Sequence, residues 1–194
     1  MGSSILMTHR NKLDEFRIAH IAEQVRKLQD EVAGVILVVS GAVASGFNFL
    51  QFRNELEKRA SAGIGQAVLT STFQRIFASK KMQIAQVLLT REDLKSPQLE
   101  ELLSLYLESG FIPMINENDA VSLNSFGGND ILASRIAALI NADKLLILST
   151  YDQSFFGVGG GETKQQALNF MKSQKIEARI LDGKHKNILM EAIL

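Results

Sequence analysis

The residues from Pro113 to Asp130, PMINENDAVSLNSFGGND, join a short apolar stretch to many amides and carboxylates. Residues 116–119, Asn-Glu-Asn-Asp, follow the apolar stretch directly, and Asn129 and Asp130 stand where a helical pattern begins. Helix N-caps, a metal site and recognition of an amino group are all compatible with these residue types. An EF-hand calcium loop is excluded, because no Glu stands at its required last position. Amides together with carboxylates suit a substrate that carries both an ammonium and a carboxylate group.

Two stretches rich in small residues have the composition of anion-binding loops. Ser40-Gly-Ala-Val-Ala-Ser-Gly46 would expose backbone N–H groups at a helix start, although a tight strand-to-helix turn has the same composition. Gly157-Val-Gly-Gly-Gly-Glu-Thr-Lys164 offers backbone donors and one lysine, and phosphate is its natural ligand; an ordinary surface loop is the alternative. It is not a Walker A loop, since no Gly-Lys-Ser/Thr ends it. It is not a dinucleotide-binding fingerprint either, since Gly157-x-Gly159 does not continue as Gly-x-Gly-x-x-Gly.

The elements that must hold these residues alternate along the chain. Short runs without polar alternation predict buried strands, and apolar residues at helical spacing predict helices. We expect strands over 35–39, 84–89, 111–115, 144–148 and 178–181, and helices over about 17–28, 55–79, 99–108, 130–141, 164–172 and 187–193. This order predicts right-handed βαβ units in a three-layer α/β/α sandwich with a mostly parallel central sheet. The 194 residues suit a single domain over 1–194.

In such sheets the ligand lies outside the carboxyl ends of the strands. The predicted strand ends carry Ser40-Gly41-Ala42, Thr90-Arg91, residues 116–119 and Ser149-Thr150. Any one of these alone is an ordinary polar loop. Four strand ends of the same character favour a binding site along one edge of the sheet.

The composition excludes several other classes of site and partner. Twenty-one basic and 21 acidic side chains balance, so no global field would attract nucleic acid or an anionic membrane. The absence of cysteine excludes disulfides, thiolate zinc sites and cysteine nucleophiles. The three histidines are scattered and suggest no ligand cluster. No apolar run reaches the roughly 18–20 residues of a membrane span, and no signal peptide is recognised, so we expect a cytoplasmic protein.

The motifs as a set resemble the amino acid kinase family, and within it the glutamate 5-kinases. The stretch Ile115-Asn-Glu-Asn-Asp-Ala120 is the most specific, because it separates glutamate 5-kinases from acetylglutamate, UMP and carbamate kinases. The other matching pieces are Gly2-Ser-Ser-Ile-Leu6, Ser40-Gly-Ala-Val-Ala44, Ala62-Gly-Ile-Gly-Gln66, Leu88-Leu-Thr-Arg91, Gly128-Asn-Asp130, Ala142-Asp-Lys-Leu-Leu146 and Gly159-Gly-Gly-Glu-Thr-Lys164.

This resemblance implies transfer of the γ-phosphoryl group of ATP to the side-chain carboxylate of L-glutamate, the first step of proline biosynthesis. Mg²⁺ would accompany ATP and be held mainly by phosphate oxygens, so no protein metal ligand is expected. Feedback inhibition by proline and a homo-oligomer, a dimer or tetramer, are implied as well. A related kinase acting on another small acid, or a non-catalytic amino-acid-sensing domain of the same fold, stays open.

The resemblance also assigns roles to individual residues. Lys164 would be the catalytic cation, and Asp130 would hold the active-site lysines in place. Ser40, Gly41 and Ala42 would line the glutamate and phosphoryl site. The residues expected at the ammonium and carboxylate ends of glutamate are Asn116, Asp119 and Asn129. Those expected at ATP are Gly2, Ser3, Ser149, Thr150, Gly159, Gly160 and Lys164.

The chain departs from the family pattern in several places. The family has a first strand that ends in Lys-x-Gly, whereas Met1 directly precedes Gly2 here. Two segments are shorter than in the family pattern, between Asp93 and Leu103 and between Thr150 and Gly157. We expect neither the family's usual final strand nor an appended RNA-binding-like (PUA-like) domain. Gly128 replaces an Asp that is common in the family, and Thr150 stands where a Ser/Thr-Asp pair is usual.

Overall fold

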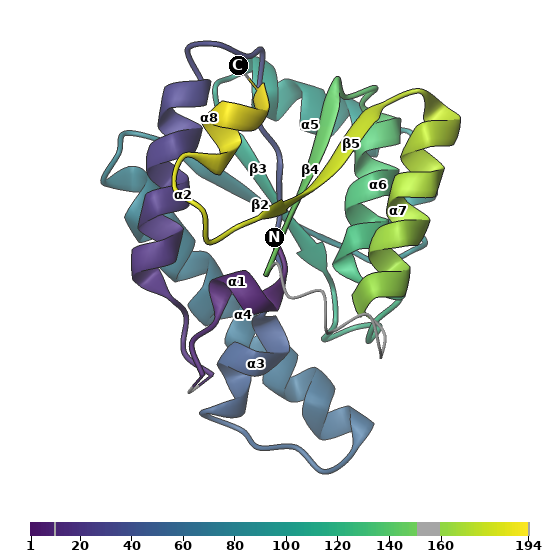
Figure 1. Ribbon diagram of the computed structural model, residues 1–194. Helices are drawn as coiled ribbons and strands as arrows, with labels where there is room; N and C mark the ends of the chain where they lie inside the picture. The colour runs from purple at the N-terminus through teal and green to yellow at the C-terminus, as the bar shows by residue number, and fades with distance from the viewer. Residues whose placement is uncertain (10, 151–159, 194) are drawn as a thin grey trace.

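Parallel strands form the framework that holds the candidate site (Figure 1). The computed structural model describes residues 1–9, 11–150 and 160–193. Strands β1 (Leu37–Val38), β2 (Ile84–Leu89) and β3 (Ile112–Glu117) form one sheet in the order β1-β3-β2. Strands β4 (Lys144–Ser149) and β5 (Glu177–Asp182) form a second sheet, and every pairing is parallel.

Helices connect the strands and follow the predicted order. Asp14 caps α2 by accepting a hydrogen bond from the Arg17 N–H at 2.9 Å, and Asn54 caps α4 through the Glu57 N–H at 2.9 Å. A short α1, which has too few residues to show a periodic pattern, was not predicted. The helices are α1 (Ser3–Leu6), α2 (Glu15–Leu28), α3 (Ala42–Phe47), α4 (Glu55–Ala78), the 3₁₀ turn η1 (Asp93–Lys95), α5 (Gln98–Glu108), α6 (Asn129–Leu139), α7 (Gly160–Gln174) and α8 (Ile188–Ile193).

The helices cover both faces of the strands, which confirms the predicted three-layer α/β/α architecture. On one face, α2, α4 and α8 pack over the strands through a core that includes Ile18, Phe73 and Leu189. On the other face, α5 and α6 pack through Leu103 and Leu132, and α7 packs beside α6. None of the helices in the described ranges is both long and apolar enough to cross a membrane.

The strands differ from the prediction in two respects. The third strand runs on to Glu117 instead of ending at residue 115, because Asn116 and Glu117 pair with Leu88 and Leu89 of β2. The strands also divide into two sheets instead of one, since β1 is only two residues long and does not pair with β4.

Glycines bring α3 and α4 into backbone contact. A Cβ atom on Gly65 would lie 1.8 Å from the Ala42 carbonyl oxygen, and one on Gly46 would lie 1.8 Å from the Ser61 carbonyl oxygen. Only glycine permits these approaches. The contact fixes the start of α3, and with it residues 40–42, against the middle of α4.

Candidate active site

A chain of hydrogen-bonded side chains joins three of the predicted substrate residues. The Asn129 amide Nδ2 donates to Ser40 Oγ at 2.8 Å and to Asn116 Oδ1 at 3.0 Å. Ser40 follows β1, Asn116 lies in β3 and Asn129 begins α6, so three separate elements meet here. Asn116 is 1% exposed, and its Nδ2 donates to Gln66 Oε1 at 2.8 Å. These contacts bring together Ser40, Asn116 and Asn129 at the carboxyl edge of the sheet.

Asn129 has one polar atom that lacks a partner. Its Oδ1 atom is buried and makes no hydrogen bond within the part of the chain that the structure describes. Buried acceptors are almost always satisfied in native proteins, and an unmet one costs about 1–3 kcal/mol. A donor carried by a ligand, such as an ammonium group, would satisfy this oxygen.

The next residue, Asp130, pairs with the lysine that follows the glycine stretch. Lys164 Nζ lies 2.8 Å from Asp130 Oδ2, with side-chain exposures of 18% and 15%, and Thr163 Oγ1 donates to the same oxygen at 3.3 Å. Asp130 lies in the first turn of α6 and Lys164 in the first turns of α7, and these two helices pack together. The structure thus places the ammonium group of Lys164 against Asp130, the residue that follows Asn129 of the amide network.

Two carboxylates line a cavity of about 460 Å³ beside this network, together with Ala42 and Gln66. Glu117 is 4% exposed, and burial raises its pKa although the N–H groups of Phe126 and Gly128 oppose the rise. Burial also raises the pKa of Asp119, whose carboxylate accepts from the Asn124 N–H at 2.8 Å. The predicted substrate residue Asp119 therefore lies at the wall of this cavity and does not join the hydrogen-bonded amides.

The cavity is also lined by two buried polar residues to which the sequence reasoning gave no individual role in the site. Gln66 was quoted only as part of a motif, and Glu117 only as a member of the polar cluster. Both are buried, and a buried polar residue needs partners. The signal for Gln66 was a long polar side chain among the small residues of Ala62-Gly-Ile-Gly-Gln66.

Backbone conformation accounts for two glycines of the site. Gly128 has a φ of 132°, which L side chains rarely adopt, whereas a Cβ there would meet Thr163 Cγ2 at an ordinary 3.6 Å. The dihedral angle, not a lack of space, therefore requires glycine at the position where the family usually has Asp. Gly41 has a φ of 108°, and a Cβ there would approach Met7 Sδ to 3.2 Å.

Four of the residues predicted at the nucleotide lie around the end of β4: Gly2, Ser3, Ser149 and Thr150. The Gly2 N–H donates to the Leu148 carbonyl oxygen at 3.2 Å, and the exposed Ser3 begins α1. Ser149 ends β4, and Thr150 follows it. Gly160 begins α7, whereas Gly159 lies outside the described residues. At the end of β2, the backbone N–H and the hydroxyl of Thr90 both donate to Asp93 Oδ2, so these groups stabilise the local turn.

Two glutamate 5-kinases are among the known proteins whose sequences are similar to this chain. A glutamate 5-kinase of Clostridium acetobutylicum is 39% identical over 162 residues, which cover 78% of this chain and 61% of that protein. A glutamate 5-kinase of Thermus thermophilus is 33% identical over 234 aligned residues, which cover the whole chain and 63% of that protein. The chain thus spans less than two thirds of either relative, and the Thermus protein has segments with no counterpart here.

The fold has close counterparts among solved structures as well. An isopentenyl phosphate kinase structure matches with a TM-score of 0.71 at 12% identity, over 100% of this chain and 93% of that one. The sequence profile of the amino acid kinase family matches residues 1–182, nearly the full length. The chain therefore belongs to the amino acid kinase family.

Proposed function

We propose that this chain is the phosphoryl-transfer domain of a glutamate 5-kinase, which transfers the γ-phosphoryl group of ATP to the side-chain carboxylate of L-glutamate. The observation that carries the proposal is the buried Oδ1 of Asn129, which has no hydrogen-bond partner among the described residues and belongs to the residue next to Asp130 of the Asp130–Lys164 pair. An acceptor for an ammonium group thus adjoins a cation suited to phosphate. The names of the relatives support the same substrate.

In this proposal, opposite ends of glutamate contact different residues. The α-ammonium group would donate to Asn129 Oδ1, and the carboxylate of Asp119 would add negative charge at the cavity wall. The side-chain carboxylate would then face Lys164. Its oxygen attacks the γ-phosphorus, the bond from that phosphorus to the β–γ bridging oxygen breaks, and ADP leaves with the bonding electrons. The attacking carboxylate is already ionised, so the step needs no general base.

Two anions must approach each other in this reaction, which makes cations and positioning the main contribution of the site. Lys164, held by Asp130, supplies one positive charge. The described residues contain no group of three or more acidic or histidine side chains that could hold a metal ion. We expect Mg²⁺ to be bound mainly through the phosphate oxygens of ATP, where it would neutralise charge. The small residues Gly2, Ser3, Ser149, Thr150 and Gly160 would leave room for the nucleotide.

An assay of glutamate-dependent ADP release tests the proposal. Lys164→Ala should lower kcat by about 100-fold or more, because it removes transition-state charge stabilisation. Lys172→Ala, an exposed lysine of the same helix, is the matched control and should change kcat less than twofold, within the range of ordinary surface substitutions. Full activity in Lys164→Ala would contradict the role proposed for this lysine.

Substrate analogues separate glutamate from other small acids. N-acetyl-L-glutamate keeps both carboxylates but lacks the ammonium group that would donate to Asn129 Oδ1. We therefore expect ADP release with L-glutamate and none with the acetylated compound. The reverse preference would indicate a related kinase of another acid.

A non-catalytic amino-acid sensor of the same fold is the second candidate, because Gly128 replaces an Asp that is common in the family and Thr150 stands where a Ser/Thr-Asp pair is usual. Calorimetric binding of glutamate without ADP release would identify this function. For the enzyme, a place in proline biosynthesis, inhibition by proline, a cytoplasmic location and a homo-oligomeric state belong to the same proposal. Adding proline to the ADP-release assay tests the inhibition directly.

A further inference from the structure

A row of hydrogen-bonded side chains leads from Asn129 through Asn116 to the surface of the molecule. Beyond Asn116, the amide Nε2 of Gln66 donates to Thr70 Oγ1 at 3.1 Å. The hydroxyl of Thr70 in turn donates to Gln86 Oε1, and Gln86 is exposed. In every bond of this row, the residue nearer Asn129 is the donor. We call Asn129, Asn116, Gln66, Thr70 and Gln86 the donor series.

A backbone group fixes the direction of the donor series. The N–H of Glu117 donates to Asn116 Oδ1 at 2.9 Å, and a backbone N–H can only donate. The oxygen of the Asn116 amide is therefore held on this side, and its Nδ2 is left to donate to Gln66 Oε1 at 2.8 Å. Turning the amide over would place two donors against each other and two oxygens against each other. Because Asn116 is buried, water cannot relieve either conflict.

The orientation of Asn116 decides which atom Asn129 offers to a ligand. Asn129 Nδ2 donates to Asn116 Oδ1 at 3.0 Å, and a reversed Asn129 amide would bring two acceptor oxygens to that separation. The other Nδ2 hydrogen is donated to Ser40 Oγ. The polar atom of Asn129 that is left for a ligand is thus Oδ1, which can only accept.

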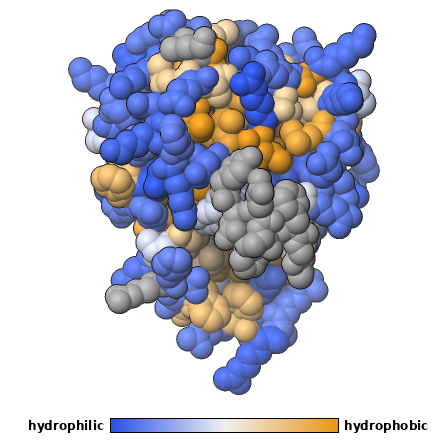
Figure 2. Space-filling model, in the orientation of Figure 1, coloured by the Kyte–Doolittle hydropathy of each residue, from blue (hydrophilic) through white to orange (hydrophobic). Residues whose placement is uncertain are grey.

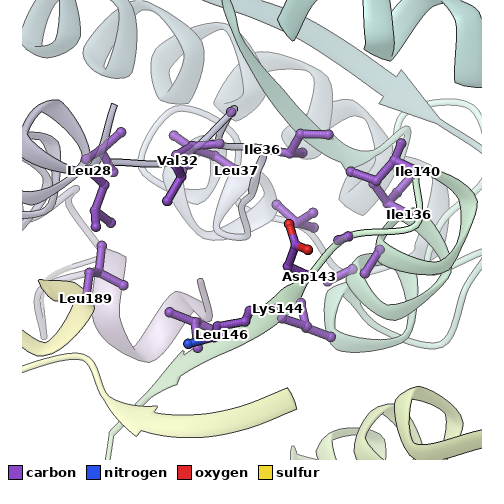
Figure 3. A pocket seen from close by; sticks show the side chains of 18 of the residues that line it. Leu28, Val32, Ile36, Leu37, Ile136, Ile140, Asp143, Lys144, Leu146 and Leu189 are labelled. Atoms are coloured by element: carbon purple, nitrogen blue, oxygen red, sulfur yellow. The ribbon is translucent and has the colours of Figure 1, made fainter. Parts of the chain in front are cut away.

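Asn129 also lines a second cavity, which supplies its Oδ1 with no donor among the described residues. This cavity of about 510 Å³ lies beside β1 and β4 (Figure 3). The side chains labelled in Figure 3 are aliphatic except for Asp143 and Lys144. The carboxylate of Asp143 is an acceptor, and the ammonium group of Lys144 donates to the Ala192 carbonyl oxygen at 3.2 Å. A donor for Asn129 Oδ1 is therefore expected from a ligand.

We propose that Gln66 is a positioning residue that makes the site select a ligand with a hydrogen-bond donor, over one with an acceptor, at Asn129. Its Oε1 holds Asn116 Nδ2, and Thr70 holds the amide of Gln66 in turn. Without this oxygen, the buried Nδ2 of Asn116 loses its acceptor, and Asn116 and Asn129 can both turn over. The selectivity rests on the proposed function, in which the donor is the ammonium group of L-glutamate.

Gln66→Met, which keeps the length of the side chain and removes its amide, tests this role. Calorimetry measures the binding of L-glutamate and of α-ketoglutarate, which carries a carbonyl oxygen in place of the ammonium group. The parent protein should prefer L-glutamate. In Gln66→Met the ratio of the two dissociation constants should shift toward α-ketoglutarate by about tenfold or more, because Asn129 is no longer held with its oxygen toward the ligand.

Gln24→Met is the matched control. Gln24 is also buried, and its Oε1 accepts from the Leu189 N–H at 2.9 Å, where α2 packs against α8. The control should lower stability but leave the ratio within about twofold of the parent value, since it lies outside the donor series. A glutamine that only supports the fold would weaken both ligands alike. An unchanged ratio in Gln66→Met would therefore overturn the proposal.

Thr70 provides a second test, which does not alter Gln66 itself. Thr70→Val removes the hydroxyl that accepts from Gln66 Nε2, so the ratio should shift in the same direction by a smaller factor. Thr70→Ser keeps the hydroxyl and should restore the preference for L-glutamate. Equal ratios in these two variants would contradict the donor series.

A measurement without ligand separates this role of Gln66 from the proposed function. With the asparagine side chains isotopically labelled, NMR follows the Nδ2 protons of Asn129. Gln66→Met should speed their exchange with water by about tenfold or more, and Gln24→Met should not. If the parent binds no L-glutamate but these protons respond as expected, the proposed function fails and the positioning by Gln66 stands. Unchanged exchange in Gln66→Met would overturn the positioning role, even in a protein that binds glutamate.

Discussion

At the residue scale, the two ends of the Asn129 amide differ in their partners. Its Nδ2 satisfies Ser40 and Asn116, whereas its Oδ1 is buried without a partner among the described residues. A buried acceptor without a hydrogen-bond partner lowers the stability of the folded protein. Such a loss of stability is common at sites that bind a ligand. The carboxylate of the neighbouring Asp130, in contrast, has a partner within the chain: it pairs with Lys164 and orients that cation.

Asn129→Leu should weaken glutamate binding specifically. Leucine has a similar volume but no acceptor for an ammonium group, so the KM for glutamate should rise about tenfold or more while the KM for ATP stays within about twofold. Steady-state kinetics with each substrate varied separately check this outcome. Asn169→Leu, on the exposed side of α7, is the control. An equal rise in both KM values would show a general disturbance of the site instead.

Glu117→Gln should change how stability depends on pH. Burial raises the folded-state pKa of Glu117 above the ordinary value of 4.5, so the folded state holds its proton more tightly than the unfolded state. Its contribution is therefore fully present below pH 4.5 and is lost as the pH rises through the folded pKa. The stability of the variant relative to the parent should increase over this interval and then level off. Urea unfolding from pH 4 to pH 8 measures the difference, and a constant difference would refute the idea.

At the element scale, the contact between α3 and α4 decides where residues 40–42 lie. Ala42 touches Gly65, and Gln66, the next residue of α4, reaches Asn116. One turn of α4 therefore supports both the loop after β1 and the amide network. A displacement of this helix would disturb both parts of the site together.

Gly65→Ala should be clearly destabilising and should lower activity as well. Its Cβ would lie 1.8 Å from the Ala42 carbonyl oxygen, so α3 must shift, at a cost of roughly 1–3 kcal/mol or more. Gly63→Ala, in the same helix, meets Ala120 Cβ at an ordinary 3.5 Å and should be neutral or stabilising by up to about 1 kcal/mol. Chemical unfolding and the ADP-release assay measure both variants. Similar losses in the two would contradict the packing argument.

Prediction from sequence succeeded where local patterns decide the structure. Apolar runs and helical spacing identified the five strands and the main helices, and the rule for strand ends placed Ser40 and Asn116 at one edge, where Asn129 at the start of α6 meets them. It failed where distant partners decide the structure. Asn116 is polar yet lies inside β3, because Gln66, 50 residues away, satisfies its amide. No local pattern reveals such a partner, nor the absence of pairing between β1 and β4.

At the scale of the whole molecule, the lobe formed by α3 and the start of α4 carries apolar side chains on its surface. Figure 2 shows hydrophobic residues on this lobe, below the grey segment. Phe49, Leu56 and Ile64 are all exposed. Along α4, the exposed residues Ala60, Gly63, Ile64 and Ala67 form an uncharged strip that another protein surface could cover. Exposed apolar patches of this kind mark association sites, and the proposed homo-oligomer would bury this one.

Ile64→Glu should therefore reduce self-association. A charge at the centre of a buried apolar contact costs several kcal/mol, enough to shift a dimer toward monomer at micromolar concentration. Light scattering coupled to size-exclusion chromatography measures the mass of each form. Leu105→Glu is the matched control, because Leu105 is 58% exposed on α5, away from this strip, while Ile64 is 41% exposed. We expect the control to keep the mass of the parent protein. A monomeric parent, or equal dissociation of both variants, would place the association site elsewhere or exclude it.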